Sequence, residues 1–196
     1  MHKTRKNKIT SIVLLLSLAV LLVFAPSCAS SMMEVEMDFG DMTSSERLAA
    51  YFAELKKNGS ITEEYPDYYG GLYYEDNTLC VVVTDRSRKT EKLIREITGS
   101  ETLKIVYGTA SLNELESEIM LISEKFQDIV DSYQSDPESL SPDLLYLYEN
   151  GFSCGLSEKD NMIIVSFPAL AEDYPNLFKE YISSYDNIVF SACYPE

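Results

Sequence analysis

Carboxylates dominate the side chains with reactive potential in this chain of 196 residues, which has 32 Asp and Glu residues and a single histidine, His2. Without an imidazole beyond His2, an enzyme would need paired carboxylates, a Ser–Lys pair or a metal held by acids. The acidic stretches Glu75-Asp76 and Glu158-Lys159-Asp160 are typical of exposed turns. A solvated carboxylate there keeps an ordinary pKa. We therefore predict no catalytic residue, no metal site and no cofactor.

The N-terminus has the organisation of a secretory leader. A basic segment ends at Lys8, and the uncharged, mostly apolar run Ile9 to Phe24 follows. Residues 1–27 are accordingly predicted to be a signal peptide, and residues 28–42 a tether. Ala25-Pro26-Ser27-Cys28 resembles the lipobox of bacterial lipoproteins, although Ala25 and Pro26 depart from its usual residues. The resemblance implies acylation of Cys28, with simple secretion or an uncleaved anchor as alternatives.

The charge of the chain limits its partners. Four of its 16 basic residues lie in the leader, so the part beyond residue 27 has 12 basic and 32 acidic residues, a net charge of −20. An acidic body repels phosphate backbones and anionic membrane surfaces. Nucleic acid is excluded as a partner, and contact with a membrane is expected only through the lipid anchor, at the outer face of the bacterial membrane.

One stretch of the sequence occurs twice. Shifted by 84 positions without a gap, Gly71 to Val106 falls on Gly155 to Phe190, with matching turns, apolar runs and helix faces. Each copy has the order strand, strand, helix, strand. The predicted strands are 71–74, 79–84 and 103–107 in the first copy, and 155–158, 162–167 and 188–193 in the second.

Helices are expected around these copies. Thr43 and Ser111 begin capping boxes, with Glu46 and Glu114 three residues later. We predict an α+β fold of two repeated units with additional packing helices. Its parts are the first repeat with its leading helix (43–110), connecting helices (111–150) and the second repeat (151–196).

The cysteines other than Cys28 have structural interpretations. A right-handed crossover makes the second and third strands of each unit parallel. If the first strand lay between them, Cys154 and Cys193 would be neighbours and could form a disulfide in an oxidising exterior. Two separate small thiols are the alternative. Cys80 lies in an apolar run and is expected in the core.

Tyrosines crowd the approach to the first repeat, at positions 65, 68, 69, 73 and 74. Packing in the core or at a sheet edge is the simpler explanation. As a surface for a protein partner we single out Tyr68, Tyr69 and Tyr73, together with the C-terminal residues Tyr194, Pro195 and Glu196.

A family resemblance supports this interpretation. Gly70-Gly71-Leu72-Tyr73-Tyr74, the apolar run to Asp85, Lys104-Ile105-Val106 and Leu112 together resemble the pro-regions of alpha-lytic-protease-type secreted serine proteases. No protease domain follows in this sequence, which departs from the family pattern. The resemblance implies binding to a protease or another folding partner and carries over no catalytic residue.

The expected function is therefore a non-enzymatic, membrane-tethered, protein-binding module outside the cell membrane. The alternative is a carboxylate-based hydrolase of cell-envelope polymers, and a purely structural envelope component is a third possibility. A cleft holding two close carboxylates with raised pKa would favour the hydrolase, and an exposed sheet would favour binding.

Overall fold

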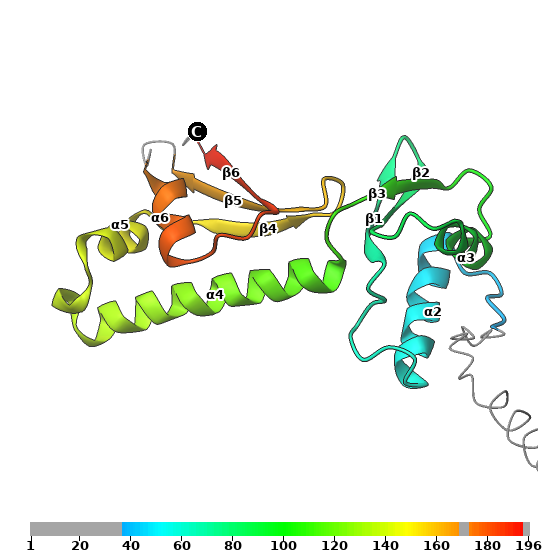
Figure 1. The fold of residues 1–196 in the computed structure, drawn as a ribbon, viewed down its shortest axis with the longest axis horizontal. Coiled ribbons are helices and arrows are strands. Elements are labelled where there is room, and N and C mark those ends of the chain that lie inside the picture. Colours follow the sequence, from blue (N-terminus) through cyan, green and yellow to red (C-terminus); the bar gives the residue numbers. More distant parts are fainter. Residues whose placement is uncertain (1–36, 169–172, 194–196) are drawn as a thin grey trace, which may run out of the picture. The chain divides into compact units, whose positions relative to one another are not determined.

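A computed structural model describes residues 37–168 and 173–193, with only the backbone of Cys193, and confirms the α+β class (Figure 1). Its elements are, in chain order, α2 (Ser44–Lys57), β1 (Tyr69–Glu75), β2 (Thr78–Val83), α3 (Arg88–Thr98), β3 (Lys104–Tyr107), α4 (Leu112–Ser135), the 3-10 helix η1 (Pro137–Ser139), α5 (Pro142–Asn150), β4 (Ser153–Ser157), β5 (Met162–Pro168), α6 (Tyr174–Tyr181) and β6 (Ile188–Cys193). Within these two ranges, no helix is both long and apolar enough to span a bilayer.

The two repeats form sheets with the same topology. The first sheet has the order β1-β2-β3 and the second β4-β5-β6. In each, the first pair of strands is antiparallel and the second pair parallel. The parallel pairing was predicted, but the expectation that the first strand lies in the middle is wrong. The second strand is central because it is the most apolar, and neighbours on both edges bury it: Leu79 to Val83 are at most 5% exposed.

The ungapped repeat offset of 84 holds only for the central strands. Val81 pairs with Leu72, whereas Val165, 84 positions later, pairs with Cys154, only 82 positions after Leu72. The difference arises in the hairpins. β1 and β2 close with the two-residue turn Asp76-Asn77, while β4 and β5 are joined by the four residues Glu158–Asn161. The repeat is therefore one of topology, with a longer loop in the second copy.

Local signals set most of the helix ends. The predicted capping boxes are present at Thr43, which begins α2, and at Ser111, which begins α4. α3 ends at Gly99, whose φ of 62° is in the left-handed region that glycine adopts without strain. These predictions from the sequence are confirmed.

Each sheet packs its helices on one face. α2 and α3 bury Leu48, Phe52, Ile94 and Ile97 beside the first sheet, where the ring centroids of Phe52 and Tyr69 are 4.8 Å apart. The second core is drawn from α4, α5, α6 and the inward side of β5. It consists of Leu115, Ile122, Ile129, Leu147, Ile163, Val165, Phe167, Tyr174, Phe178 and Ile182 with Ala110.

The opposite face of the second sheet is open among the residues described. Along β5, Ile163, Val165 and Phe167 are buried, whereas Met162, Ile164 and Ser166 are half-buried. This alternation is typical of a strand with one covered and one exposed face.

Candidate interaction surface

The loop between β4 and β5, Glu158–Asn161, binds the first repeat, and we call it the joint loop. Asn161 has a left-handed backbone (φ 53°) and a side chain that is only 4% exposed. Its Oδ1 accepts hydrogen bonds from the amides of Thr109 (2.8 Å) and Ala110 (2.9 Å). Its Nδ2 donates to the carbonyl oxygens of Gly70 (3.1 Å) and Ala110 (2.9 Å). The side-chain amide thus has every hydrogen bond it can make with its two donors and one acceptor atom.

Two glycines make room for this side chain. A Cβ on Gly108 would lie 2.4 Å from Oδ1 of Asn161, and one on Gly70 would lie 3.0 Å from its Nδ2. Any larger residue at Gly108 would displace Asn161 from the backbone groups that it pairs. The glycines therefore define the receiving site for the joint loop.

Charged groups complete the joint. The amide of Leu72 donates to the carboxylate of Glu158, and Lys159 forms a salt bridge of 2.9 Å with Glu75. Glu75 also pairs with Lys104 at 2.9 Å. These two lysines lower the pKa of Glu75 to about 2, with the Lys159 hydrogen bond as the largest cause. The expectation of an ordinary pKa in this turn is wrong for Glu75, because the partner lysine comes from the other repeat.

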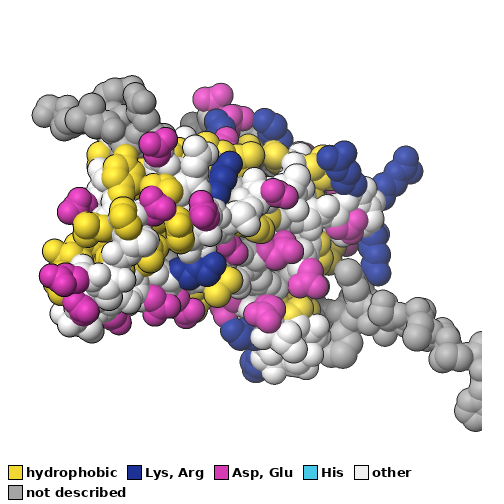
Figure 2. Space-filling view, turned by 60° about the vertical axis from the view of Figure 1, so that its left-hand side comes forward, with side chains coloured by type: hydrophobic (Ala, Val, Ile, Leu, Met, Phe, Trp, Pro, Cys, Tyr) yellow, Lys and Arg dark blue, Asp and Glu magenta, His cyan; other side chains and the backbone are white. Residues whose placement is uncertain are grey.

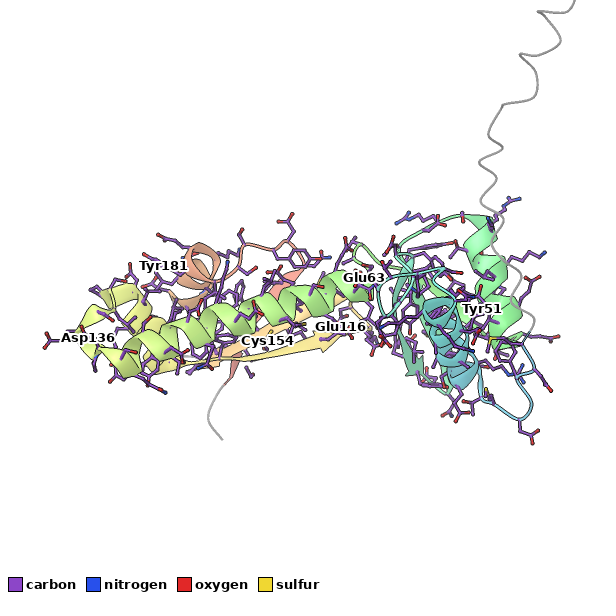
Figure 3. The ribbon with its side chains drawn as sticks, turned by 90° about the horizontal axis from the view of Figure 1, so that it is seen from below. Tyr51, Glu63, Glu116, Asp136, Cys154 and Tyr181 are labelled. Atoms are coloured by element: carbon purple, nitrogen blue, oxygen red, sulfur yellow. The ribbon has the colours of Figure 1, made fainter. Side chains whose placement is uncertain are left out.

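The cysteines do not form the disulfide that we expected. β5 lies between β4 and β6, so Cys154 and Cys193 belong to strands on opposite edges of the sheet. Two strand spacings put their backbones at least about 10 Å apart, and their pairing with Val165 and Pro168 offsets them further along β5. A disulfide needs Cα atoms within about 7 Å. Cys154 is a free, half-buried thiol on β4, and burial raises its pKa (Figure 3). Cys80 is a free thiol in the core, as predicted.

The tyrosines are divided between core and surface. Tyr69 is 4% exposed and packs between the rings of Phe52 and Tyr65, and the hydroxyl of Tyr68 is buried. Packing in the core, the simpler explanation given for these tyrosines, therefore holds for Tyr69, and neither Tyr69 nor the hydroxyl of Tyr68 is open to a partner in this structure. Tyr73 is half-buried, with the ammonium of Lys159 5.9 Å from its ring centroid. Tyr194, Pro195 and Glu196 lie outside the described residues, as does Cys28.

Two groups of acids bear on the hydrolase alternative. Partial burial raises the pKa of Glu116 on α4, and the carboxylates of Glu64 and Glu158 add to the shift (Figure 3). Glu116 is nevertheless exposed, and Glu158 already accepts the Leu72 amide. No group of three or more His, Cys, Asp or Glu suited to a metal ion occurs in residues 37–168 and 173–193.

The second acidic group lines a surface cavity of about 710 Å³. Its four carboxylates come from Glu63, Asp67, Glu114 and Glu118. Glu114 accepts the amide and hydroxyl of Ser111 in the capping box, and Glu118 accepts the hydroxyl of Ser183. Glu114 thus caps the start of α4, and Glu118 is hydrogen-bonded to Ser183, two residues after the end of α6.

The open face of the second sheet exposes apolar surface among the residues described. At its centre, Ile164 is flanked by Gly155 on β4 and Val189 on β6. A Cβ added to Gly155 would meet nothing within 4 Å, and Val189 is 44% exposed. In the first sheet, Tyr73 occupies the place equivalent to Gly155 and lies beside Cys80. The second sheet therefore exposes apolar surface that the first sheet covers with a tyrosine.

Comparison with known families places one part of the chain. Residues 38–108 match the Pro-like N-terminal domain. The matched segment runs from just before α2 to Gly108, which follows β3 and receives Asn161. It supports the resemblance to a pro-region for this part of the chain, and the second sheet lies outside it. No curated protein matches the chain.

Sequence reasoning missed Asn161 as the residue that joins the repeats. Asp160-Asn161 was interpreted as a local turn, which its positive φ bears out. The local signal available was Gly108 directly after a strand, since an isolated glycine there indicates close approach of another group. The identity of that group depends on tertiary contacts.

The joint predicts a specific loss of stability. Asn161→Ala would leave buried amide and carbonyl groups of Gly70, Thr109 and Ala110 without partners. We expect unfolding by urea to show a loss about 2–4 kcal/mol larger than for Asn77→Ala. Asn77 is the matched control because it has a similar φ (63°) and an exposed side chain, so the backbone strain of alanine cancels. Equal losses in the two variants would contradict the role of the Asn161 amide.

The ion pairs of Glu75 predict a pH effect. Because the pKa of Glu75 is lowered to about 2, its contribution to stability is present above the unfolded value of about 4.3 and is lost as the pH falls toward 2. NMR titration of the Glu75 carboxyl carbon should show a higher pKa in Lys159→Gln. Lys179→Gln, with its lysine on α6, is the control and should leave the Glu75 pKa unchanged. If the pKa of Glu75 were the same in Lys159→Gln as in the wild type, the ion pair between the two repeats would be refuted.

Proposed function

We propose that this protein is a non-enzymatic, extracytoplasmic, protein-binding module of the pro-region type. The match of residues 38–108 to the Pro-like N-terminal domain is the observation that carries the proposal. A pro-region acts by binding a folded or folding partner, so a secreted protease or another folding partner is the class of protein we expect it to bind.

The open face and edge of the second sheet are the proposed contact. Edge strands offer unpaired backbone groups to an added strand. β6 is an edge strand with exposed residues at Val189, Ser191 and Ala192. A partner strand that contacted Ile164 and Val189 would bury apolar surface. Its backbone hydrogen bonds to β6 would fix its alignment along the strand.

The hydrolase alternative rests on Glu116, whose pKa is raised beside Glu64 and Glu158. Binding is the better supported function because Glu116 is exposed and Glu158 is engaged with a backbone amide at the joint. A carboxylic acid needs a water-poor environment to serve as a general acid near neutral pH.

The proposed location is the outer face of the membrane, where a lipid on Cys28 would anchor the protein. Metabolic labelling with a fatty-acid probe should label the wild-type protein and leave Cys28→Ala unlabelled. Cys154→Ala is the control, because its half-buried thiol is on β4 and should not affect labelling. A label retained in Cys28→Ala would exclude this residue as the acylation site.

The binding function predicts loss of partner capture on changing one exposed residue. Val189→Lys places a charge on the proposed contact, and Met120→Lys places the same charge on α4, where Met120 is 63% exposed. Both positions are exposed, so we expect stability changes within about 0.5 kcal/mol. Photo-crosslinking from Ser191 in an envelope extract, read by mass spectrometry, should yield a specific partner with wild type and Met120→Lys and none with Val189→Lys.

The captured protein must then respond to binding. If it is a secreted protease, adding the protein at equimolar amounts should lower its activity on a peptide substrate, and Val189→Lys should not. Capture that is equal in all variants would reject the second sheet as the contact. A captured protease whose activity does not change on adding the protein would reject an effect of binding on its partner.

A further inference from the structure

Positive charge is concentrated in one short segment of this acidic protein. The ten residues from Arg86 to Arg95 contain five basic residues and one acid, Glu91. Residues 43–108 as a whole contain nine basic and eleven acidic residues, a net charge of −2. Residues 109–196 contain three basic and seventeen acidic residues, a net charge of −14. The net charge therefore conceals a segregation, and Figure 2 shows several dark blue side chains projecting from one side of the molecule, with others interspersed among the acidic ones.

The fold exposes this segment as one helix face. α3 turns Thr90, Ile94 and Ile97 toward the core, so the remaining positions of the helix face solvent. The basic face consists of Arg88, Lys89, Lys92 and Arg95, all exposed. Most of it lines a shallow surface cavity of about 580 Å³ with Glu91, Glu96 and Glu101.

Local contacts neutralise only part of the basic face. Lys92 pairs with Glu96 at 3.3 Å, and both side chains are exposed. Glu91 accepts a hydrogen bond from the Tyr107 hydroxyl, and the guanidinium of Arg86 lies 5.1 Å from the centroid of the Tyr107 ring. Arg88 and Lys89 form no ion pair with the described residues. The face thus retains positive charge for an external anion.

The entry of the chain lies beside this helix. α2 packs on α3, and Arg47 of α2 donates to the carbonyl oxygens of Met42 and Gly40 in the segment that leads into α2. The guanidinium of Arg47 also lies at the end of α3, where a Cβ on Gly99 would be 2.7 Å from its Nη1. Met37 follows Cys28 by nine residues, which span at most about 30 Å when extended. An anchor at Cys28 would keep Met37 within about 30 Å of the bilayer, and the segment that follows Met37 leads to the end of α3 through Arg47.

We propose that the basic face of α3 docks on the anionic headgroups of the membrane to which the protein is tethered. The proposal rests on the membrane address in the proposed function. Charges on the protein farther than about 10 Å from the surface are screened at 0.1 M salt. The basic face can therefore bind anionic lipid although the chain as a whole is acidic. This revises the expectation that the body of the protein simply repels anionic membranes.

The test uses the fragment Met37–Glu196, which forms one compact unit and contains every described helix and strand. It lacks the leader and Cys28, so its binding does not depend on acylation. In sedimentation with phosphatidylcholine vesicles, it should bind only when phosphatidylglycerol is included, and high salt should release it. Absence of binding to the anionic vesicles, or equal binding to neutral ones, would overturn the proposal.

A matched pair of variants locates the binding. Arg88→Glu/Lys89→Glu/Lys92→Glu should lower the affinity for phosphatidylglycerol vesicles by about 100-fold or more, since each basic residue near an anionic surface contributes several-fold. Lys56→Glu/Lys57→Glu/Lys179→Glu changes the net charge by the same amount on α2 and α6. It should bind within a few-fold of wild type, with both variants unfolding cooperatively. Equal losses would mean that net charge alone governs binding and would refute a site on α3.

Two further experiments distinguish lipid binding by α3 from binding of an acidic protein and from partner binding by the second sheet. A polyglutamate peptide that displaced the fragment from vesicles at equal charge concentration would indicate an acidic protein partner and would overturn the assignment to lipid. Val189→Lys should keep vesicle binding, because it changes the second sheet and leaves α3 intact. If Val189→Lys loses partner capture but still binds vesicles, the membrane site on α3 stands and the two functions are separate. If the wild-type fragment captures its partner but does not bind anionic vesicles, the membrane site is refuted and the proposed binding function remains.

Discussion

The structure depends on the buried side-chain amide of Asn161. It pairs two amides and two carbonyl oxygens of the first repeat at the positions where β1 begins and the chain passes from β3 to α4. Those groups lie under the joint loop, where losing their partner would cost more than an exposed hydrogen bond does. The two repeats are consequently held together by polar groups that need hydrogen-bond partners, and they belong to one compact unit, Met37–Glu196.

The same joint explains why the two repeats differ. The four-residue loop of the second hairpin is long enough to reach the first sheet, whereas the first hairpin has the two-residue turn Asp76-Asn77. The joint loop brings Lys159 over Tyr73 on the first sheet. The corresponding face of the second sheet has Gly155 in place of that tyrosine and remains open. Two units of the same topology thus form a molecule with one covered and one available sheet.

The sequence predicted what local interactions decide and failed where distant residues meet. The capping boxes at Thr43 and Ser111, the left-handed end of α3 and the parallel pairing of the second and third strands all follow from short-range rules. The strand order and the Cys154–Cys193 disulfide depend on which strand is central. The pKa of Glu75 depends on Lys159, a residue 84 positions away.

The prediction from charge is limited for the same reason. Composition gives only the net charge, whereas binding depends on where the charged residues lie on the surface. The net charge of the chain excludes partners only if its charges are mixed evenly, and here the basic residues gather on α3 while the acidic ones dominate residues 109–196. Because salt screens distant charges, the attraction between an approaching surface and the protein depends on the nearest charges more than on the net charge. An anionic membrane would then orient the protein by α3, with the acidic part repelled from it. The open sheet lies in that acidic part, which would leave it available to a partner on the solvent side.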